Sequence, residues 1–272
     1  MPELLLIGLG DLGTLIAAEA LKQGMAVQAM RRKAQGLSGV SMVRHDAATT
    51  WPVIAGRVTD LVLCVAPDNS GESAYQQAYI AIAKQALCWL RQQSQPAHVW
   101  LVSSTSVYGQ QHGEWVTEQS PRLPARSTAK ILVAAEDLWL QSGFCCTMLR
   151  PAGLYGPGRE MMLRQAKSGQ QIVESRPVYT NRIEISDCAR AVIHLIDRRH
   201  QGFSPEVAYN LTDLHPARYC EVIQFLQQQL AIAPGTEQHV TRGSKRVSAE
   251  RLQQSGFCWQ YPDYKTGYQA ML

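Results

Sequence analysis

Short apolar runs alternate with amphipathic segments along the first half of the chain. The apolar runs at 3–7 and 61–65 predict buried strands, whereas apolar residues at helical spacing predict a helix over 11–23. The same pattern predicts strands at 26–30, 41–43, 98–102 and 145–149 and helices at 72–93 and 129–141. Strands that alternate with helices form a parallel sheet covered on both faces, so we predict an α/β fold with a doubly wound sheet.

The second half of the chain has a different order of elements. Helical spacing predicts helices at 161–168, 188–196 and 217–230, and apolar runs predict strands at 182–185 and 207–211. Neither a low-complexity linker nor an internal repeat divides the sequence. We therefore predict a nucleotide-binding domain over 1–154 and a small substrate-side lobe over 155–272, some segments of which return to the sheet.

A glycine-rich turn links the first strand to the first helix. Gly8, Gly10 and Gly13, with Asp11 and Leu12 inside the motif, spell G-x-G-x-x-G. Gly8 permits a tight turn, Gly10 lets the backbone approach a pyrophosphate, and Gly13 allows close packing of helix on strand. The pyrophosphate then lies at the positive end of the helix. This context predicts a Rossmann-type domain that binds a dinucleotide.

The end of the second strand bears on which dinucleotide binds. A fold that binds NAD tends to place Asp or Glu there for the ribose hydroxyls. This chain has Arg31 and Arg32 instead, and arginine suits the doubly charged 2′-phosphate of NADP. The alternative is a solvated basic turn. The sequence thus favours NADP over NAD as the cofactor.

Other positions after the predicted strands have two interpretations each. Asp46 either accepts a hydrogen bond from the adenine amino group or forms a turn. Ala66 and Pro67 either leave room for a ribose or begin a Pro-Asp turn. The hydroxyl-rich segment 103–109 follows the fifth strand, where ligands bind in open α/β sheets, although serines also cap polar turns.

Four segments carry a resemblance to a known family. They are SSTSVYG at 103–109, LRPAGLYGPGR at 149–159, IEISDCARAV at 183–192 and SAERLQQSGFCWQYPD at 248–263. With the glycine motif, they resemble the extended, NAD-dependent epimerase/dehydratase branch of the short-chain dehydrogenase/reductase superfamily, and in particular an atypical subgroup of it. The resemblance implies a Rossmann fold, an NAD(P) cofactor and a C-terminal substrate lobe.

The catalytic positions implied by the resemblance are incomplete. Ser104 takes the position of the family's serine, and Lys130 takes that of the lysine that holds the nicotinamide ribose. The catalytic tyrosine belongs four residues before this lysine, where the chain has Arg126. Because arginine is always protonated in proteins, Arg126 cannot act as a general base.

Two tyrosines follow the fifth and sixth strands and are candidates to replace the missing one. They are Tyr108 and Tyr155, for which ordinary packing is the alternative. By resemblance, Pro151 borders the nicotinamide. Arg150 is expected to be a charge in a turn or at the sheet end, and Asp187 to cap the following helix.

These residues favour an NADP(H)-dependent oxidoreductase, or an epimerase-like enzyme, that acts on a small polar substrate. The rival hypothesis is an NADP(H) sensor or regulator that has kept the cofactor site and lost catalysis. Arg126 favours the sensor, whereas Ser104 and Lys130 favour the enzyme. A homo-oligomer is compatible with either hypothesis.

Composition and charge argue against several other classes of protein. The chain is 46% hydrophobic and 18% charged, which is ordinary for a globular protein. Its net charge of +4 is mild, and no basic cluster exceeds Arg31-Arg32-Lys33, so we expect no nucleic-acid partner. No apolar run reaches a membrane-spanning length, and the N-terminal run is too short for a signal peptide.

The seven cysteines bear on the compartment of the protein. Their spacings fit a reducing compartment rather than a disulfide framework or a metal site. We therefore expect a cytoplasmic protein without a metal. Four cysteines with apolar neighbours are predicted to be buried thiols: Cys64, Cys88, Cys188 and Cys220.

Overall fold

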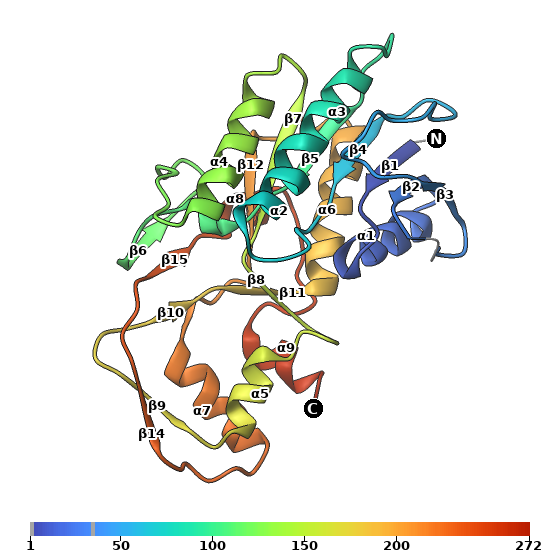
Figure 1. Cartoon of the computed structure of the whole chain (residues 1–272). Coiled ribbons are helices and arrows are strands. Elements are labelled where there is room, and N and C mark those ends of the chain that lie inside the picture. The colour runs from blue at the N-terminus through green and yellow to red at the C-terminus, as the bar shows by residue number, and fades with distance from the viewer. Residues whose placement is uncertain (1–2, 34–35) are drawn as a thin grey trace. The chain divides into compact units, whose positions relative to one another are not determined.

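A computed structural model describes residues 3–33 and 36–272 (Figure 1). The chain forms two compact units, each assembled from separate segments. The first unit contains the described residues up to Val107, with Arg122–Arg150 and Ala189–Tyr209. The second contains Tyr108–Pro121, Pro151–Cys188 and Asn210–Leu272. The division after residue 154 was predicted between a cofactor-binding part and a substrate-side part, and it stays a prediction. The two compact units do not follow this boundary, because the first includes Ala189–Tyr209 and the second includes Tyr108–Pro121.

The first unit is built on a seven-stranded sheet with the order β12-β7-β5-β4-β1-β2-β3. Its strands are β1 (Glu3–Ile7), β2 (Ala26–Arg31), β3 (Val40–Arg44), β4 (Asp60–Leu63), β5 (His98–Val102), β7 (Cys146–Pro151) and β12 (Ala208–Leu211). Neighbouring strands from β3 to β7 pair in parallel. The order reverses between β1 and β4, as in a doubly wound sheet. The predicted Rossmann-type α/β fold is confirmed.

Helices connect these strands and supply much of the apolar core. They are α1 (Asp11–Lys22), α2 (Glu72–Tyr75), the π-helical η1 (Gln76–Ala81), α3 (Ile82–Leu90), the 3₁₀ turn η2 (Thr105–Val107), α4 (Ser127–Leu140) and α6 (Ile185–His200). In Figure 1, α3 and α4 lie next to one another. Side chains from α3, α4 and the central strands form one buried cluster that includes Leu61, Leu87 and Trp139. This core holds the strand ends in place.

The second unit combines short helices with two-stranded pairings. Its helices are α5 (Met161–Lys167), α7 (Tyr219–Gln229), α8 (Glu250–Gln254) and α9 (Tyr264–Gln269). The strand pairs are β6 (His112–Val116) with β15 (Ser244–Val247), β8 (Gly153–Tyr155) with β11 (Arg182–Glu184), β9 (Gln171–Glu174) with β14 (Glu237–Val240), and β10 (Tyr179–Thr180) with β13 (Ala217–Arg218). Helices α5, α7 and α9 share a buried cluster that includes Leu163, Leu226 and Tyr268.

Arg150 lies one residue from the end of β7, as expected of a sheet-end charge, and there it is buried and forms an ion pair with Glu136 of α4 at 2.6 Å. Two other expectations about single residues are wrong. Asp187 does not cap a helix. It lies within α6, where it accepts hydrogen bonds from the backbone of Gln260 and Tyr261 at 3.0 and 2.7 Å. Cys88 is exposed, because it faces away from the core between two buried neighbours on α3.

The remaining cysteines differ in burial. Cys188 is buried as expected, and Cys64 and Cys220 are half-buried. None of the seven cysteines, all of which lie in the described part of the chain, is in a disulfide. Within the part of the chain that the structure describes, no helix has both the length and the hydropathy needed to cross a membrane.

Candidate cofactor and catalytic site

The glycine turn between β1 and α1 has the geometry that its motif requires. Gly8 has a φ of +97°, and a Cβ placed on it would lie 2.2 Å from the carbonyl oxygen of Cys64. A Cβ on Gly13 would lie 2.1 Å from the carbonyl oxygen of Gly8. Both positions therefore exclude any side chain. Gly8 also donates its backbone N–H to Met30 at 3.0 Å, which joins the turn to the end of β2.

Gly10 is different, because the space beside it is open. A Cβ on Gly10 would meet no heavy atom within 4 Å, and the backbone angles of −85° and −160° suit any residue. Gly10 is the N-cap of α1, and no side chain caps this end of the helix. Asp11 is exposed and Leu12 is buried in the core. The turn therefore offers backbone N–H groups and room for a pyrophosphate, which fits a dinucleotide.

The two arginines after β2 differ in their surroundings. Arg31 is the last residue of β2 and is half-buried. Arg32 is exposed and holds Asp68 through two contacts of 2.8 and 2.5 Å. This hydrogen bond raises the pKa of Arg32 and lowers that of Asp68. A carboxylate thus already occupies the guanidinium fork of Arg32.

Asp68, the partner of Arg32, is not marked by any motif in the sequence. It lies in the loop after Ala66 and Pro67, which were interpreted as room for a ribose or as a turn. Ala66 is exposed and Pro67 is half-buried beyond the end of β4. The only signal in the sequence is the Pro-Asp pair itself, because Asp68 and Arg32 are 36 residues apart in the chain.

Asp46 forms a turn after β3. Its Oδ1 accepts the backbone N–H of Ala48 at 3.0 Å, and its carbonyl oxygen accepts that of Thr49 at 3.0 Å. The side chain is exposed. His45, its neighbour, donates its backbone N–H to Arg31, so Asp46 lies close to the end of β2. The turn role is present, and the adenine contact stays a prediction.

The serine-rich segment follows β5 and packs against α4. Ser104 is half-buried, and its Oγ accepts the backbone N–H of Ser106 at 3.1 Å. The preceding Ser103 is buried, and its Oγ has no hydrogen-bond partner among the described residues. The 3₁₀ turn η2 that follows contacts α4. The structure therefore places the hydroxyl groups of this segment next to α4.

Arg126 and Lys130 are one helical turn apart at the start of α4. Arg126 is the N-cap residue, and its carbonyl oxygen accepts the backbone N–H of Lys130 at 3.0 Å. Both side chains are exposed. A guanidinium and an ammonium group thus occupy the positions implied for tyrosine and lysine. They can bind an anion or stabilise an oxyanion, but Arg126 cannot accept a proton.

Tyr108, Tyr155 and Pro151 belong to the second unit. Tyr108 is buried and donates its hydroxyl to Asn210 at 2.7 Å. Tyr155 is buried against Tyr268, with ring centroids 4.5 Å apart, and its hydroxyl has no partner within the described chain. Burial raises the pKa of Tyr155 far above its usual range, so its phenol stays protonated. Pro151, the last residue of β7, is also buried.

Comparisons with known proteins identify the family to which the chain is similar. Residues 8–212 match the family model described as NAD dependent epimerase/dehydratase family. Protein YeeZ of Escherichia coli K12 is 27% identical, over 97% of each chain. A Methylobacillus flagellatus structure named for the same family is 31% identical, with a TM-score of 0.80 over 99% of this chain and 97% of the other. The expected likeness to the atypical subgroup, which YeeZ typifies, is confirmed.

A more distant structure has the same fold. The human epimerase family protein SDR39U1, solved with NADPH, is 17% identical and has a TM-score of 0.76. The alignment covers 98% of each chain. At this identity the likeness concerns the fold alone.

Proposed function

Since this chain belongs to the NAD dependent epimerase/dehydratase family, we propose that it is an NADP(H)-dependent oxidoreductase acting on a small polar substrate. The observation that carries the cofactor choice is Arg31. It ends β2, where an acidic residue would bind the ribose hydroxyls of NAD. Its charge suits a 2′-phosphate, and the NADPH bound to the distant human relative is in keeping with this choice.

The cofactor would be held by main-chain groups at one end and by side chains at the other. Gly8, Gly10 and Gly13 give the pyrophosphate its approach to the start of α1, and Arg31 would bind the 2′-phosphate. Lys130 would donate to the nicotinamide ribose. Bound NADP(H) supplies a hydride donor and acceptor to the site.

The chain's own residues suggest how a substrate would be oriented. Ser104 would donate a hydrogen bond to the substrate oxygen, and Arg126 would bind an anionic group or stabilise developing negative charge. Substrates that carry a carboxylate or phosphate suit this pair. When a carbonyl is reduced, the proton that its oxygen takes up then comes from water or from the substrate. Neither the guanidinium of Arg126 nor the Tyr155 phenol, whose pKa is raised by burial, readily gives up a proton at neutral pH.

The second candidate function is a sensor or regulator that binds NADP(H) without consuming it. Arg126 at the tyrosine position is the observation that favours it. Both functions require the same cofactor site. They differ in whether Ser104 and Arg126 matter for turnover.

Calorimetric titration with NADPH and NADH tests the cofactor proposal. Because an arginine–phosphate pair contributes a few kcal/mol at most, we expect NADPH to bind about ten- to a few hundred-fold more tightly than NADH. Arg31→Ala should remove most of this preference and leave NADH binding nearly unchanged. Arg32→Ala should have a smaller effect, because Asp68 holds that guanidinium.

Arg91→Ala is the matched control, because Arg91 is exposed and lies at the C-terminal end of α3. It removes the same charge without approaching the glycine turn. Equal affinities for the two cofactors, or tighter binding of NADH, would contradict the proposal. So would an equal loss in Arg31→Ala and Arg91→Ala.

A further inference from the structure

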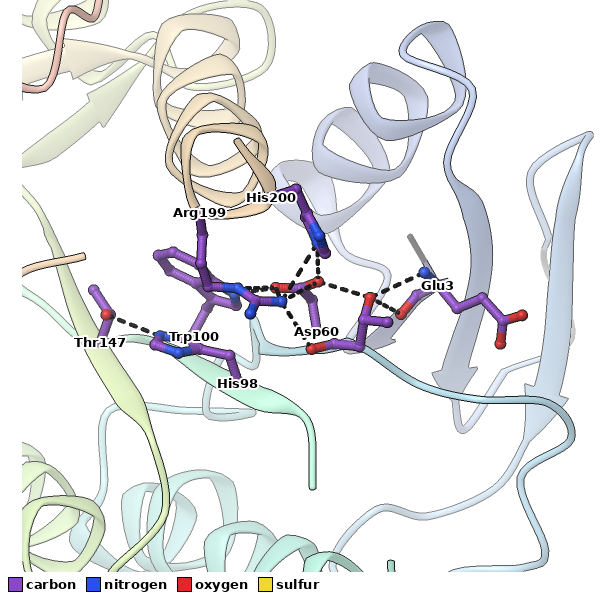
Figure 2. Close-up of polar contacts among 8 residues, drawn as sticks. Glu3, Asp60, His98, Trp100, Thr147, Arg199 and His200 are labelled. Carbon is purple, nitrogen blue, oxygen red and sulfur yellow. Dashed lines mark hydrogen bonds and ion pairs between the residues drawn. The ribbon is translucent and has the colours of Figure 1, made fainter. Parts of the chain in front are cut away.

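A second polar cluster lies at the opposite end of the strands from the glycine turn. Asp60 begins β4, His98 begins β5, and Arg199 and His200 end α6. Figure 2 shows Arg199 and His200 directed toward Asp60, and the ring of His98 directed toward Thr147. In a parallel sheet the amino ends of the strands share one edge, so this cluster is separate from the cofactor turn at the carboxyl edge.

A buried carboxylate fixes the geometry of the cluster. Asp60 is 1% exposed and accepts hydrogen bonds from Trp100 at 2.9 Å and Thr59 at 2.8 Å. It also contacts Arg199 at 3.0 Å and His200 Nε2 at 2.6 Å. Burial opposes ionisation of Asp60, but Arg199 and these hydrogen bonds outweigh it and lower the pKa of the carboxyl group. The charged Asp60 thereby holds the guanidinium and imidazole groups in place.

A cavity of about 230 Å³ lies beside this cluster. The polar side chains that line it are Arg57, Thr59, Gln95, His98, Arg199 and His200. Two of these carry guanidinium groups and two carry imidazoles, whereas no carboxylate is among the lining residues. Asp60 contacts three of the lining residues, Thr59, Arg199 and His200, without lining the cavity itself. The chemistry of the lining suits an anion.

Two guanidinium groups retain donors for a ligand. Asp60 and the Thr59 carbonyl oxygen engage the Nε and Nη2 atoms of Arg199, while Nη1 has no partner within residues 3–33 and 36–272. Arg57 is exposed and has no ion pair with the described part of the chain. Asp60 offsets the charge of Arg199, which leaves the charge of Arg57 uncompensated within the lining.

The stability of helix α6 alone does not account for the basic residues around the cavity. Basic residues in the last turn of a helix complement its dipole, which explains why Arg199 and His200 occur there. Arg57 and His98 come from other segments, before β4 and at the start of β5. Their convergence on one cavity with the end of α6 is what indicates a ligand.

We propose that this cavity binds a small oxyanion of the phosphate class, either free phosphate or a phosphate monoester. Guanidinium groups bind phosphate oxygens through paired hydrogen bonds, and two of them suit a doubly charged group better than a single carboxylate. The volume is below the range of about 300–1,000 Å³ typical of drug-sized ligands, so the ligand is small. Its binding would join α6 to the segments that precede β4 and β5.

Calorimetric titration with sodium phosphate and with glycerol phosphate, at constant ionic strength set by sodium chloride, tests this proposal. Arg57→Gln removes one ligand group without disturbing the Asp60 cluster, because the Arg57 side chain is exposed. We expect saturable binding that Arg57→Gln weakens about ten- to a hundredfold. Arg91→Gln, a matched loss of an exposed charge, should leave the affinity unchanged.

Phosphate also suits the glycine turn, so the titrations are repeated in the Gly10→Val background. The phosphate site at Arg57 should persist there, whereas cofactor binding should not. Tighter binding of glycerol phosphate would identify a monoester, and equal or tighter binding of inorganic phosphate would identify the free anion. An absence of saturable binding, or an equal affinity in Arg57→Gln, would overturn the proposal without affecting the proposed cofactor site.

Discussion

At the scale of single residues, the environment of His98 changes its acid–base chemistry. Its ring lies 4.6 Å from that of Trp100, and its Nε2 is 3.0 Å from the hydroxyl of Thr147. Burial and, to a smaller extent, the nearby charge of Arg199 lower the pKa of His98 from 6.5 to about 4, although the charge of Asp60 opposes this shift. His98 is therefore neutral at neutral pH, and the folded protein binds a proton there less readily than the unfolded chain does.

This difference predicts a loss of stability in mild acid. The contribution of neutral His98 is fully present above pH 6.5 and is lost as the pH falls toward 4, because only the unfolded chain becomes protonated in this window. The shift corresponds to at most about 3 kcal/mol in the free energy of unfolding. Urea unfolding at pH 7 and pH 4.5 should show a smaller pH dependence in His98→Gln than in the native protein.

The control for this experiment is His112→Gln, because His112 is exposed on β6 in the other unit. It should keep the native pH dependence. Asp60 does not affect the comparison. Because its pKa is lowered, its contribution to stability is present above pH 3.8 and is lost only as the pH falls below that value. Equal slopes for the native protein and His98→Gln would contradict the prediction.

Residues whose role depends only on their neighbours in the sequence could be predicted. Gly8 and Gly13 follow from a motif of six residues, and their close contacts are those that the motif implies. The partners of Arg32 and Arg199 could not be predicted, because Asp68 and Asp60 are 36 and 139 residues away from them. Pairings over such distances depend on strand order, which local patterns do not specify.

At the scale of elements, the turn between β1 and α1 predicts different results for two glycine substitutions. Gly10→Val should keep the fold, because its backbone angles suit a branched residue and the neighbouring space is open. It should abolish cofactor binding, since the new side chain occupies the approach of the pyrophosphate. Circular dichroism and calorimetry with NADPH would measure the two effects.

Gly8→Ala provides the contrast within the same turn. Its Cβ would meet the carbonyl oxygen of Cys64, so this variant should lose thermal stability as well as binding. If folded Gly10→Val binds NADPH with native affinity, the cofactor lies elsewhere.

Elements of the sheet were easier to predict than those of the second unit. An isolated apolar run or a long helical repeat was sufficient for β1, β5 and α4. The predicted helix at 217–230 instead begins at Tyr219, after the two-residue strand β13. Short strands such as β10 exist only because a distant segment pairs with them, so no local pattern marks them. The helix expected at 188–196 extends over Ile185–His200, because the Glu184 carboxylate accepts the backbone N–H of Ser186 at its start.

At the scale of the whole molecule, each of the two units is assembled from segments that are separated along the chain. The family model ends at residue 212, yet the C-terminal segment beyond it is held by Asp187 through Gln260 and Tyr261. This segment is therefore part of the second unit's structure rather than an appendage. The cofactor residues of the proposed function, by contrast, all lie in the first unit.

The choice between enzyme and sensor also concerns the whole molecule, and a screen of carbonyl compounds for NADPH oxidation tests it. The panel should emphasise carboxylated and phosphorylated carbonyls, which suit the guanidinium of Arg126. If the protein is an enzyme, Ser104→Ala and Arg126→Ala should each lower kcat at least about tenfold, because each removes a donor to the reacting oxygen. Ser106→Ala, which alters an exposed neighbouring hydroxyl, should keep native turnover.

Turnover that neither Ser104→Ala nor Arg126→Ala reduces would refute the site assignment. A sensor would bind NADPH without oxidising it, and Arg126→Tyr, which restores the family's proton donor, would then be the variant that gains activity.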